Sequence, residues 1–324
     1  MTSPQPPPKT IHTSPLTTEQ ATRLRTLLTE RGWKFDTRPY MLYFAQSEKL
    51  TVAVYEKGPK IVVQGKGTAE FVQFILEPEI LGEAKFGYEE VNDPAMFEPH
   101  FGIDESGKGD FFGPLVIAGA YVDRGIARTF LDAGIQDSKR IGSDKKIRDF
   151  AGLIRRTPGT IPSVVVIGPE RYNQLYKKFG NLNRLLAWGH ARVIENLLER
   201  RPDCPRALSD QFANPKLIER ALLEKGRGIR LDQRTKAESD LAVAAASILA
   251  REGFIDWLEK NGRAFQKELP RGASGLVKTT ARELVATHGA EILERVAKTH
   301  FKTALEVAPE YFSRASLPGA DDVV

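Results

Sequence analysis

The sequence predicts two domains, a small α+β domain followed by a larger domain of layered α/β architecture. Between Tyr40 and Gln64, short runs of β-branched and aromatic residues separated by turn residues are typical of a strand meander. From Phe101 onward, apolar runs alternate with helical patterns, which indicates helices packed on a sheet. An acidic segment divides the two regions, and a chain of 324 residues is long enough for both domains.

The elements of the first domain follow from local patterns. A helix is expected between Leu16 and Gly32, with Thr17 or Thr18 as its cap and the glycine as its stop. Strands are expected over residues 40–44, 50–55 and 60–64, with a closing helix over residues 69–76.

The second domain begins with a strand at Phe101–Ile103 and continues with the apolar strand Leu115–Val122. Further strands are expected over residues 163–167 and 205–209, and helices over residues 145–155, 170–179, 183–200 and 239–252. The last of these helices contains a run of alanines. Such small residues let a helix pack closely on a sheet, so we expect it to lie against the strands.

Composition excludes several classes of protein. No apolar run approaches the roughly 20 residues that cross a bilayer, and the proline-rich residues 1–9 lack the apolar stretch of a secretory signal. We therefore expect a soluble, cytoplasmic protein without membrane association. The single cysteine, Cys204, excludes an internal disulfide and a cysteine zinc cluster, which agrees with a reducing compartment.

Charge is distributed unevenly along a chain of net charge +5. Residues 1–76 carry ten Lys or Arg against six Asp or Glu, residues 77–98 carry seven acids against one lysine, and the remainder is again basic. Two basic blocks favour a polyanionic partner. The sheet of the first domain can offer aromatic and basic residues to a nucleic-acid backbone, and a merely solvated face is the open alternative.

The loop after the Phe101 strand carries the clearest chemical signal. Asp104 and Glu105 end an apolar run and are followed directly by Ser106, Gly107, Lys108 and Gly109. Carboxylates at a strand end are usual ligands of Mg²⁺ or Mn²⁺, while glycines beside a lysine let backbone amides approach a phosphodiester or ribose. Metal-dependent phosphoryl chemistry on nucleic acid is therefore the first hypothesis.

The same loop allows two other interpretations. Gly102 to Lys108 fits the G-x-x-x-x-G-K pattern of a nucleotide-triphosphate loop, but Gly109 stands where that loop requires Ser or Thr. Asp104 and Glu105 would also repel the phosphates. An ordinary strand followed by a polar turn is the plainer alternative.

Two further acids are candidates for a two-metal site, which needs several converging carboxylates. Asp210 ends the strand that contains Ser209, where a simple turn residue is an equally good interpretation. Asp240 lies at the start of the alanine-rich helix, where a helix cap is the alternative. Spacing along the chain leaves open whether the four acids converge in space.

A series of motifs occurs in order over about residues 99–310: Gly102–Pro114, Asp137–Lys139, Asn181–Asn183, Ser209–Phe212, Lys236–Asp240 with Ala244–Ala250, and Leu269–Ser274. Together they resemble bacterial ribonuclease HIII, a type 2 ribonuclease H. The preceding module resembles the TATA-binding-protein-like substrate-binding domain of that family. The resemblance implies a ribonuclease H-like mixed sheet with flanking helices, Mg²⁺ or Mn²⁺ as cofactor, and two-metal-ion endonucleolytic hydrolysis of the RNA strand of RNA–DNA hybrids, leaving 5′-phosphate and 3′-hydroxyl ends.

The resemblance also implies roles for individual residues. The catalytic and metal-binding acids fall on Asp104, Glu105, Asp210 and Asp240. The substrate-binding residues fall on Ser106, Gly107, Lys108, Gly109, Ser138, Lys139 and Asn181, with the Gly-Lys-Gly loop holding ribose 2′-hydroxyls. Arg271 stands where the family usually has lysine, so the charge is retained.

The expected organisation is a disordered tail over residues 1–14, a substrate-binding α+β domain over 15–82, an acidic linker over 83–98, the catalytic domain over 99–312 and a disordered tail over 313–324. We expect a monomer whose partner is the RNA–DNA hybrid, with no protein partner evident. The alternatives are a ribonuclease HII-like enzyme that cuts at single ribonucleotides in DNA, and a catalytically silent hybrid-binding protein. His100 and His300 are candidates for proton transfer and phosphate contact, although loop histidines are more often structural, and His190 is expected to be a packed helix residue.

Overall fold

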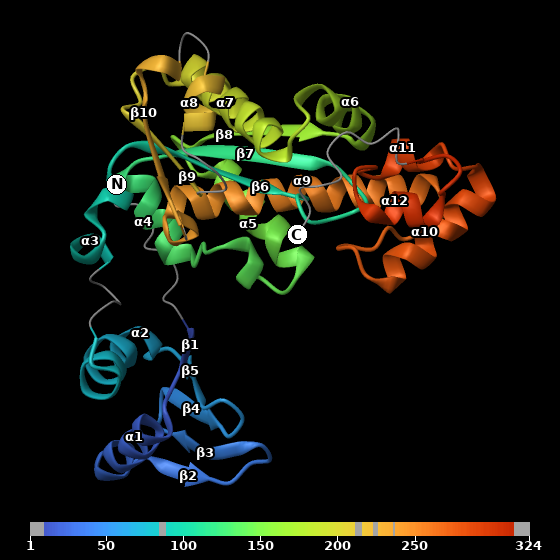
Figure 1. Cartoon of the computed structure of the whole chain (residues 1–324). Helices are drawn as coiled ribbons and strands as arrows, with labels where there is room; N and C mark the ends of the chain where they lie inside the picture. Colours follow the sequence, from blue (N-terminus) through green and yellow to red (C-terminus); the bar gives the residue numbers. More distant parts are fainter. Residues whose placement is uncertain (1–9, 84–88, 211–215, 223–225, 236, 314–324) are drawn as a thin grey trace. The chain divides into compact units, whose positions relative to one another are not determined.

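The computed structural model describes residues 10–83, 89–210, 216–222, 226–235 and 237–313 (Figure 1). The chain divides into two compact units, one of residues 1–97 with Leu131–Gly134 and one of residues 98–130 with 135–324. The tails predicted over residues 1–9 and 314–324, and the motif residues Gln211, Phe212 and Lys236, lie outside the described residues. No described helix combines the length and apolar character needed to span a membrane.

The first unit is a five-stranded antiparallel sheet in the order β1-β5-β4-β3-β2. Its elements are β1 (Ile11–Pro15), α1 (Thr18–Glu30), β2 (Lys34–Asp36), β3 (Met41–Gln46), β4 (Leu50–Tyr55), β5 (Lys60–Gly65) and α2 (Thr68–Phe71), which continues as the π-helix η1 (Val72–Leu81). The predicted first helix and three strands are confirmed. The predicted disorder over residues 1–14 is wrong for residues 11–14, because β1 pairs with β5 along its whole length.

Helix α1 begins with a capping box and packs its apolar stripe on one face of this sheet. The hydroxyl of Thr17 accepts from the amide of Gln20, and the Gln20 side chain accepts from the amide of Thr17 at 2.8 Å. The buried residues of α1 share a core with the inward side chains of the strands and of η1: Ala21, Leu24, Leu28, Val52, Val54, Ile61, Val63, Val72 and Leu76.

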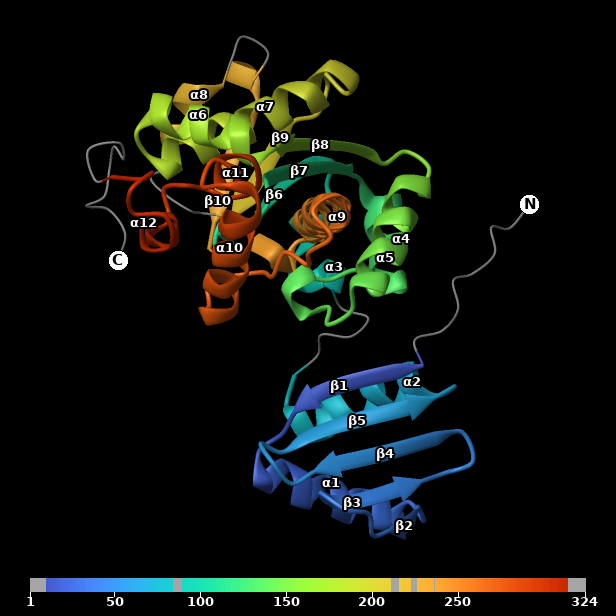
Figure 2. The same cartoon turned by 90° about the vertical axis from the view of Figure 1, so that its right-hand side faces the viewer.

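The opposite face of this sheet is free of the unit's own helices, which lie behind the sheet in Figure 2. Phe44, Ala53 and Val62 are neighbours across β3, β4 and β5 on that face. The guanidinium carbon of Arg38 lies 3.4 Å from the centre of the Phe44 ring, which is only 7% exposed. On this face a cation therefore covers an aromatic ring.

The stretch of chain that connects β5 to β6 contains more helix than the sequence predicts. The helix expected over residues 69–76 extends to Leu81 with Pro78 inside it, and Gly82 follows with a φ of +68°. Within the expected linker lie α3 (Glu89–Asn92) and the 3₁₀ turn η2 (Pro94–Phe97), in which two apolar side chains are buried.

The second unit is built on a mixed five-stranded sheet in the order β10-β9-β6-β7-β8. The strands are β6 (His100–Ser106), β7 (Leu115–Val122), β8 (Ile161–Ile167), β9 (Arg206–Asp210) and β10 (Arg230–Arg234). Strands β10, β9 and β6 are parallel, whereas β7 and β8 are antiparallel to their neighbours. Four of the five strands are predicted correctly, and the edge strand β10 is not.

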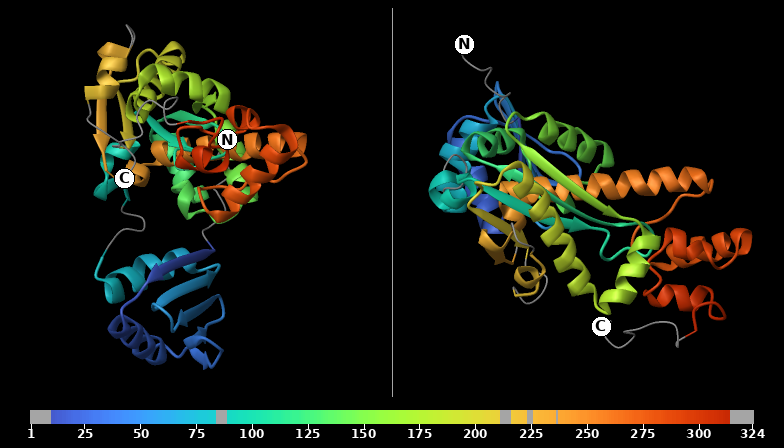
Figure 3. Two further views of the ribbon diagram at one scale, coloured as in Figure 1. Left: turned by 45° about the vertical axis from the view of Figure 1, so that its right-hand side comes forward. Right: turned by 90° about the horizontal axis from the view of Figure 1, so that it is seen from above.

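Helices cover both faces of this sheet: α4 (Arg124–Ala133), α5 (Asp144–Arg156), α6 (Pro169–Phe179), α7 (Leu182–Arg200), α8 (Lys216–Ala221), α9 (Leu241–Ala264), α10 (Gly275–His288), α11 (Ile292–Val296) and α12 (Lys302–Val307), with the 3₁₀ turns η3 (Ser138–Arg140), η4 (Gly226–Gly228) and η5 (Ala237–Ser239). Helix α9 packs on β6 and β7 with α5 beside it, and α7 packs on the other face against β7 and β8 (Figures 1 and 2). Helices α10 to α12 gather near the C-terminal end of α9 (Figure 3).

Glycine permits the closest contact between α9 and the sheet. A Cβ atom on Gly102 of β6 would lie 2.1 Å from the carbonyl carbon of Ala242, so no larger residue fits there. On the other face, a Cβ atom on Gly189 of α7 would lie 2.7 Å from the side chain of Ile117. These contacts hold α9 closely against β6, which carries Asp104 and Glu105, and α7 against the neighbouring β7.

Candidate active site

Asp104, Glu105 and Asp210 come together at one edge of the mixed sheet. Asp104 and Glu105 lie near the end of β6, and Asp210 is the last residue of β9. These strands are parallel and pair Ile103 with Ser209, so Asp104 and Asp210 occupy neighbouring positions on strands about 5 Å apart. Both side chains therefore emerge on the same face of the sheet.

The adjacent acids Asp104 and Glu105 differ in their tendency to ionise. Asp104 is only 8% exposed, and burial together with the charge of Glu105 raises its pKa to about 8. Burial also opposes ionisation of Glu105, but a hydrogen bond from His190 and the charges of Lys108 and Lys139 lower the pKa of Glu105 overall. The pair carries its full negative charge at neutral pH only when more positive charge is supplied. Its hard oxygen donors suit Mg²⁺ or Mn²⁺.

His190 of α7 contacts the Glu105 carboxylate from the face of the sheet on which α7 packs. Its Nε2 lies 3.1 Å from Oε2 of Glu105, and its Nδ1 lies 3.0 Å from the hydroxyl of Ser209. Because a carboxylate only accepts, Nε2 carries the proton in this contact. The ring is fully buried, as expected of a packed helix residue, but its contact with Glu105 was not anticipated.

Lys139 of η3 lies among four acidic residues. Burial works against its charge, but Asp104, Asp137, Glu238 and Asp210 together raise its pKa. The lysine therefore stays protonated and offsets part of the negative charge of the site. The same contacts show that Glu238 belongs to this electrostatic cluster.

Glu238 is a further acid near the pair, because its charge, like those of Asp104, Asp137 and Asp210, acts on Lys139. It lies half-buried on η5, which is held against the end of β9 because the amide of Ala237 donates to Oδ1 of Asp210 at 3.3 Å. Glu238 could not be predicted from the sequence, because no element boundary marks it, whereas Asp240, two residues later, begins the alanine-rich helix. The structural observation that identifies Glu238 is the effect of its charge on the pKa of Lys139.

Asp240 has a structural position instead. Its Oδ1 accepts from the amides of Ala242 and Val243 at 2.8 and 3.2 Å, which caps α9. Its two oxygens also lie 2.9 and 3.0 Å from Nε2 of His100. His100 precedes Asp104 by four residues on β6, a separation of about 13 Å along the strand. In this structure Asp240 therefore caps α9, which was the alternative interpretation of this residue, and His100 is its partner.

Two other candidates lie away from the acids. The Asn181 side chain caps α7 by accepting from two amides of its first turn. Asn181 precedes His190 by nine residues, about 13 Å along the helix. The ring of His300 stacks on that of Tyr176 with centroids 4.3 Å apart, and burial lowers the pKa of His300 to about 4. Neither residue lines the cavity described next.

A cavity of about 430 Å³ opens over the acids. Its wall contains the other predicted site residues together with five that the structure adds: Asp104, Glu105, Ser106, Gly107, Lys108, Gly109, Ser138, Lys139 and Asp210, then Asp110, Ser247, Arg251, Phe254 and Arg271. The ammonium of Lys108 lies 3.8 Å from Oε1 of Glu105. Among the described residues, no three His, Cys, Asp or Glu side chains form a ready cluster of metal ligands.

The two loops of the cavity wall are fixed in different ways, one by a glycine turn and the other by hydrogen bonds. Gly107 has a φ of +89°, and a Cβ atom there would lie 2.2 Å from the carbonyl oxygen of Pro114, so the turn after Glu105 requires glycine. In the other loop, the Asp137 side chain accepts from the amide of Lys139, and the hydroxyls of Ser138 and Ser247 are 2.7 Å apart.

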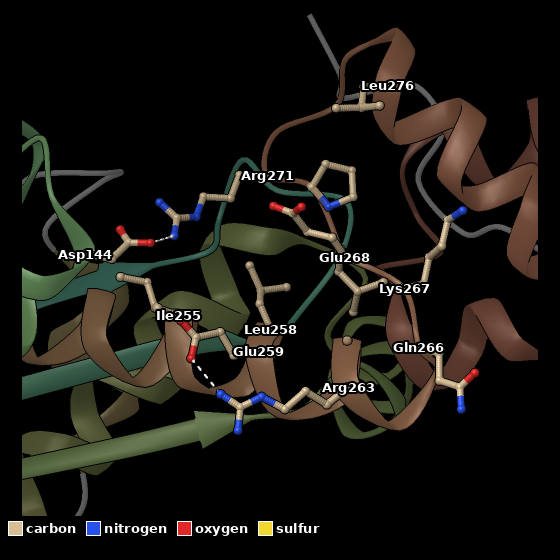
Figure 4. A pocket seen from close by; sticks show the side chains of 13 residues that line it. Asp144, Ile255, Leu258, Glu259, Arg263, Gln266, Lys267, Glu268, Arg271 and Leu276 are labelled. Carbon is tan, nitrogen blue, oxygen red and sulfur yellow. Dashed lines mark hydrogen bonds and ion pairs between the residues drawn. The ribbon is translucent and has the colours of Figure 1, made fainter.

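A larger cavity of about 780 Å³ adjoins the first through Arg271, which lines both (Figure 4). Arg271 forms an ion pair with Asp144, and the cavity floor includes the apolar Ile255 and Leu258. Its wall carries both acids and bases, among them Glu259, Arg263, Lys267 and Glu268. The smaller cavity is the candidate active site, because Asp104, Glu105 and Asp210 line it and none of them lines the larger one.

The chain matches known ribonucleases over most of its length. Residues 101–304 match the family model described as ribonuclease HII. The chain is 44% identical to ribonuclease HIII of Protochlamydia amoebophila over 276 residues, which cover 85% of this chain and 89% of that protein. It is 42% identical to ribonuclease HIII of Chlamydia pneumoniae over 304 residues, covering 93% and 98% of the two chains.

The fold agrees with these matches. The crystal structure of Bst-RNase HIII in complex with Mn²⁺ is 27% identical, with a TM-score of 0.62 and coverage of 93% of this chain and 99% of that chain. The predicted ribonuclease H-like fold is thereby confirmed, and the N-terminal antiparallel sheet agrees with a TATA-binding-protein-like domain. The chain belongs to the ribonuclease HII family and, within it, to the ribonuclease HIII enzymes.

Proposed function

We propose that this enzyme is an endonuclease that hydrolyses the RNA strand of RNA–DNA hybrids. The observation that carries the proposal is the meeting of Asp104, Glu105 and Asp210 at the ends of two parallel strands, beneath a cavity that Lys108 and Lys139 line. In the reaction, water attacks phosphorus and the bond to O3′ breaks. The products are therefore a 3′-hydroxyl and a 5′-phosphate.

The acids fit divalent cations, because two buried neighbouring carboxyl groups are held where full ionisation requires extra positive charge. We propose that Asp104, Glu105, Asp210 and Glu238 hold two Mg²⁺ or Mn²⁺ ions. When bound, such ions activate the attacking water and stabilise the leaving oxygen. Lys139 balances the remaining negative charge.

The cavity wall supplies contacts to the scissile strand. Ser106, Gly107, Lys108 and Gly109 place a hydroxyl, backbone amides and an ammonium beside Glu105. Such groups can bind the ribose 2′-hydroxyl that distinguishes RNA from DNA and the adjacent phosphate. Ser138 acts chiefly through its hydrogen bond to Ser247, which positions Lys139.

We further propose that residues 15–82, with the added strand β1, form the hybrid-binding domain, that residues 83–98 connect it, and that residues 99–312 form the catalytic domain. The proposed contact surface is this face of the sheet, on which the exposed Arg38 covers Phe44. We also propose that the enzyme works as a monomer in the cytoplasm.

The test is cleavage of an end-labelled RNA–DNA hybrid with Mg²⁺, with Mn²⁺ and with chelator. The Asp104→Asn variant and a DNA duplex with one ribonucleotide are included. We expect metal-dependent cuts in the RNA strand that disappear in the variant and are scarce on the single-ribonucleotide duplex. Efficient cutting at the lone ribonucleotide would instead indicate ribonuclease HII-like specificity, and binding without cleavage would indicate a hybrid-binding protein.

A further inference from the structure

The loop that carries Lys108 rests on a lysine with no exposed surface. Lys298 lies between α11 and α12, and its side chain is 0% exposed. A buried ammonium is costly unless its hydrogen bonds are satisfied. Its Nζ donates to the main-chain carbonyls of Asp110 at 2.9 Å and of Gly113 at 2.7 Å. Both acceptors belong to the loop between β6 and β7.

The backbone on either side of Lys298 holds the same loop. The amide of Lys298 donates to the carbonyl of Phe111 at 2.8 Å, and the amide of Gly113 donates to the carbonyl of Val296 at 2.9 Å. Phe112 and Ala297 form an isolated antiparallel bridge between these contacts. Residues 296–298 thus form a short stretch of sheet with residues 111–113 of the loop.

A third segment completes the arrangement. The amide of Gly272 donates to the Asp110 side chain at 2.6 Å, and the amide of Phe111 donates to the carbonyl of Gly272 at 3.0 Å. Gly272 follows Arg271 of the cavity wall. Lys298 therefore lies beneath the junction of two loops that line the cavity, although it is not itself part of the wall.

We propose that Lys298 is a positioning residue that holds the loop of residues 107–113 so that Lys108 and the neighbouring amides face the substrate strand. The proposal rests on the proposed function for its kinetic consequence and on hydrogen bonds alone for its structural one. The Lys298 side chain needs two N–H donors here, because Nζ contacts two carbonyl oxygens and carbonyl oxygens only accept. The nearest aromatic rings, Tyr172 and Phe254, have centroids 5.7 and 5.9 Å from Nζ.

Two substitutions separate the donors of this side chain from its length. Lys298→Met keeps an unbranched chain but removes both donors, and Lys298→Gln keeps two N–H donors on a shorter, uncharged chain. Lys302→Met, which removes an exposed lysine of α12, is the matched control. We expect Lys298→Met to raise KM for the hybrid about tenfold, consistent with loss of one or two hydrogen bonds in a positioned loop, with kcat within about threefold of wild type. Lys298→Gln should recover part of the loss, and Lys302→Met should leave both constants unchanged.

Hydrogen exchange of the full-length protein gives a second readout that does not depend on catalysis. Amides of residues 107–114 should exchange faster in Lys298→Met, while those of β7 and α9 keep the wild-type rate. An unchanged KM with unchanged loop exchange would overturn the proposal, as would a fall in kcat at constant KM. If wild type cuts no hybrid, the proposed function fails, whereas the exchange experiment still decides whether Lys298 holds the loop.

Discussion

At the scale of single residues, the site depends on which of two acids lies near the pair Asp104 and Glu105. The two are Glu238, within η5, and Asp240, which directly follows η5. The electrostatic contacts of Lys139 point to Glu238, whereas the oxygens of Asp240 are occupied by the cap of α9 and by His100. We expect Glu238→Gln to lower kcat at least a hundredfold with little change in stability. Asp240→Asn should instead leave kcat near that of wild type, because asparagine caps a helix about as well as aspartate.

The measurement for this pair is single-turnover cleavage of the hybrid together with denaturant unfolding of each variant. The two variants are matched, because each replaces one carboxylate by its amide, and the positions are two residues apart. Loss of activity in Asp240→Asn at full stability, with Glu238→Gln remaining active, would restore the assignment that the sequence favoured.

His190 gives a second prediction at this scale, since it orients Glu105 from the opposite side to the cavity loops. Groups that hydrogen-bond a metal ligand typically change metal affinity by 10- to 100-fold when they are removed. We therefore expect His190→Leu to weaken Mn²⁺ binding by about that factor, measured by calorimetry without substrate. His190→Gln, which can still donate to Glu105, should lose less. Equal Mn²⁺ affinity in wild type and His190→Leu would show that Glu105 needs no such support.

At the scale of elements, the strands and helices with regular apolar patterns could be predicted, and those without them could not. The fully buried strand β7 and the capped helix α1 follow from the sequence, because burial and capping leave a local pattern. The edge strands β1 and β10 lack that pattern: β10 is rich in charged residues, and each pairs with one neighbour only.

The site illustrates the same limit. The adjacent acids Asp104 and Glu105 could be found from their position before a glycine-rich turn. The choice between Glu238 and Asp240 depends on how a three-residue 3₁₀ turn orients its side chains, and His190 reaches Glu105 only because α7 packs on the sheet. Tertiary contacts of this kind leave no signal in residue spacing.

Lys298, which holds the loop of residues 107–113, gives a pH prediction at the element scale. Burial lowers the pKa of Lys298 from 10.5 to about 7, and the nearby charge of Asp110 only partly offsets this. Around it, burial lowers the pKa of His300 to about 4 and raises that of Tyr172, so both remain neutral between pH 7 and 10. In that range the unfolded chain binds a proton at Lys298 that the folded protein does not bind. The contribution of Lys298 to stability therefore rises with pH from about 7 to about 10.5 and is lost as the pH falls toward 7.

Denaturant unfolding at pH 6, 8 and 10 tests this sign. The free energy of unfolding of Lys298→Met minus that of wild type should be higher at pH 6 than at pH 10. It should fall by a few kcal/mol over that range. Lys302→Met should show no such trend, because that lysine is exposed. A stability difference independent of pH would mean that the buried amine titrates normally.

At the scale of the whole molecule, the division into two compact units predicts a division of labour. The first unit is a sheet with one face covered by its own helices, and the other face carries the Arg38–Phe44 contact. Removing residues 1–82 should weaken hybrid binding at least tenfold, while single-turnover cleavage at saturating enzyme stays within about threefold of the full chain. The dependence of affinity on salt should also become shallower, since fewer phosphates are neutralised by Lys and Arg.

Point substitutions on the two sides of the first sheet sharpen this test without deleting a domain. Arg38→Ala removes a cation from the open face, and Arg23→Ala removes an exposed cation from α1, which packs on the opposite face. Each changes the net charge equally, so a general electrostatic effect would weaken binding in both. We expect a loss of affinity, measured by titration of a labelled hybrid at several salt concentrations, for Arg38→Ala alone. Equal losses would assign the first unit a diffuse attraction for polyanions, and an unchanged affinity in the truncated chain would leave hybrid recognition to the catalytic domain.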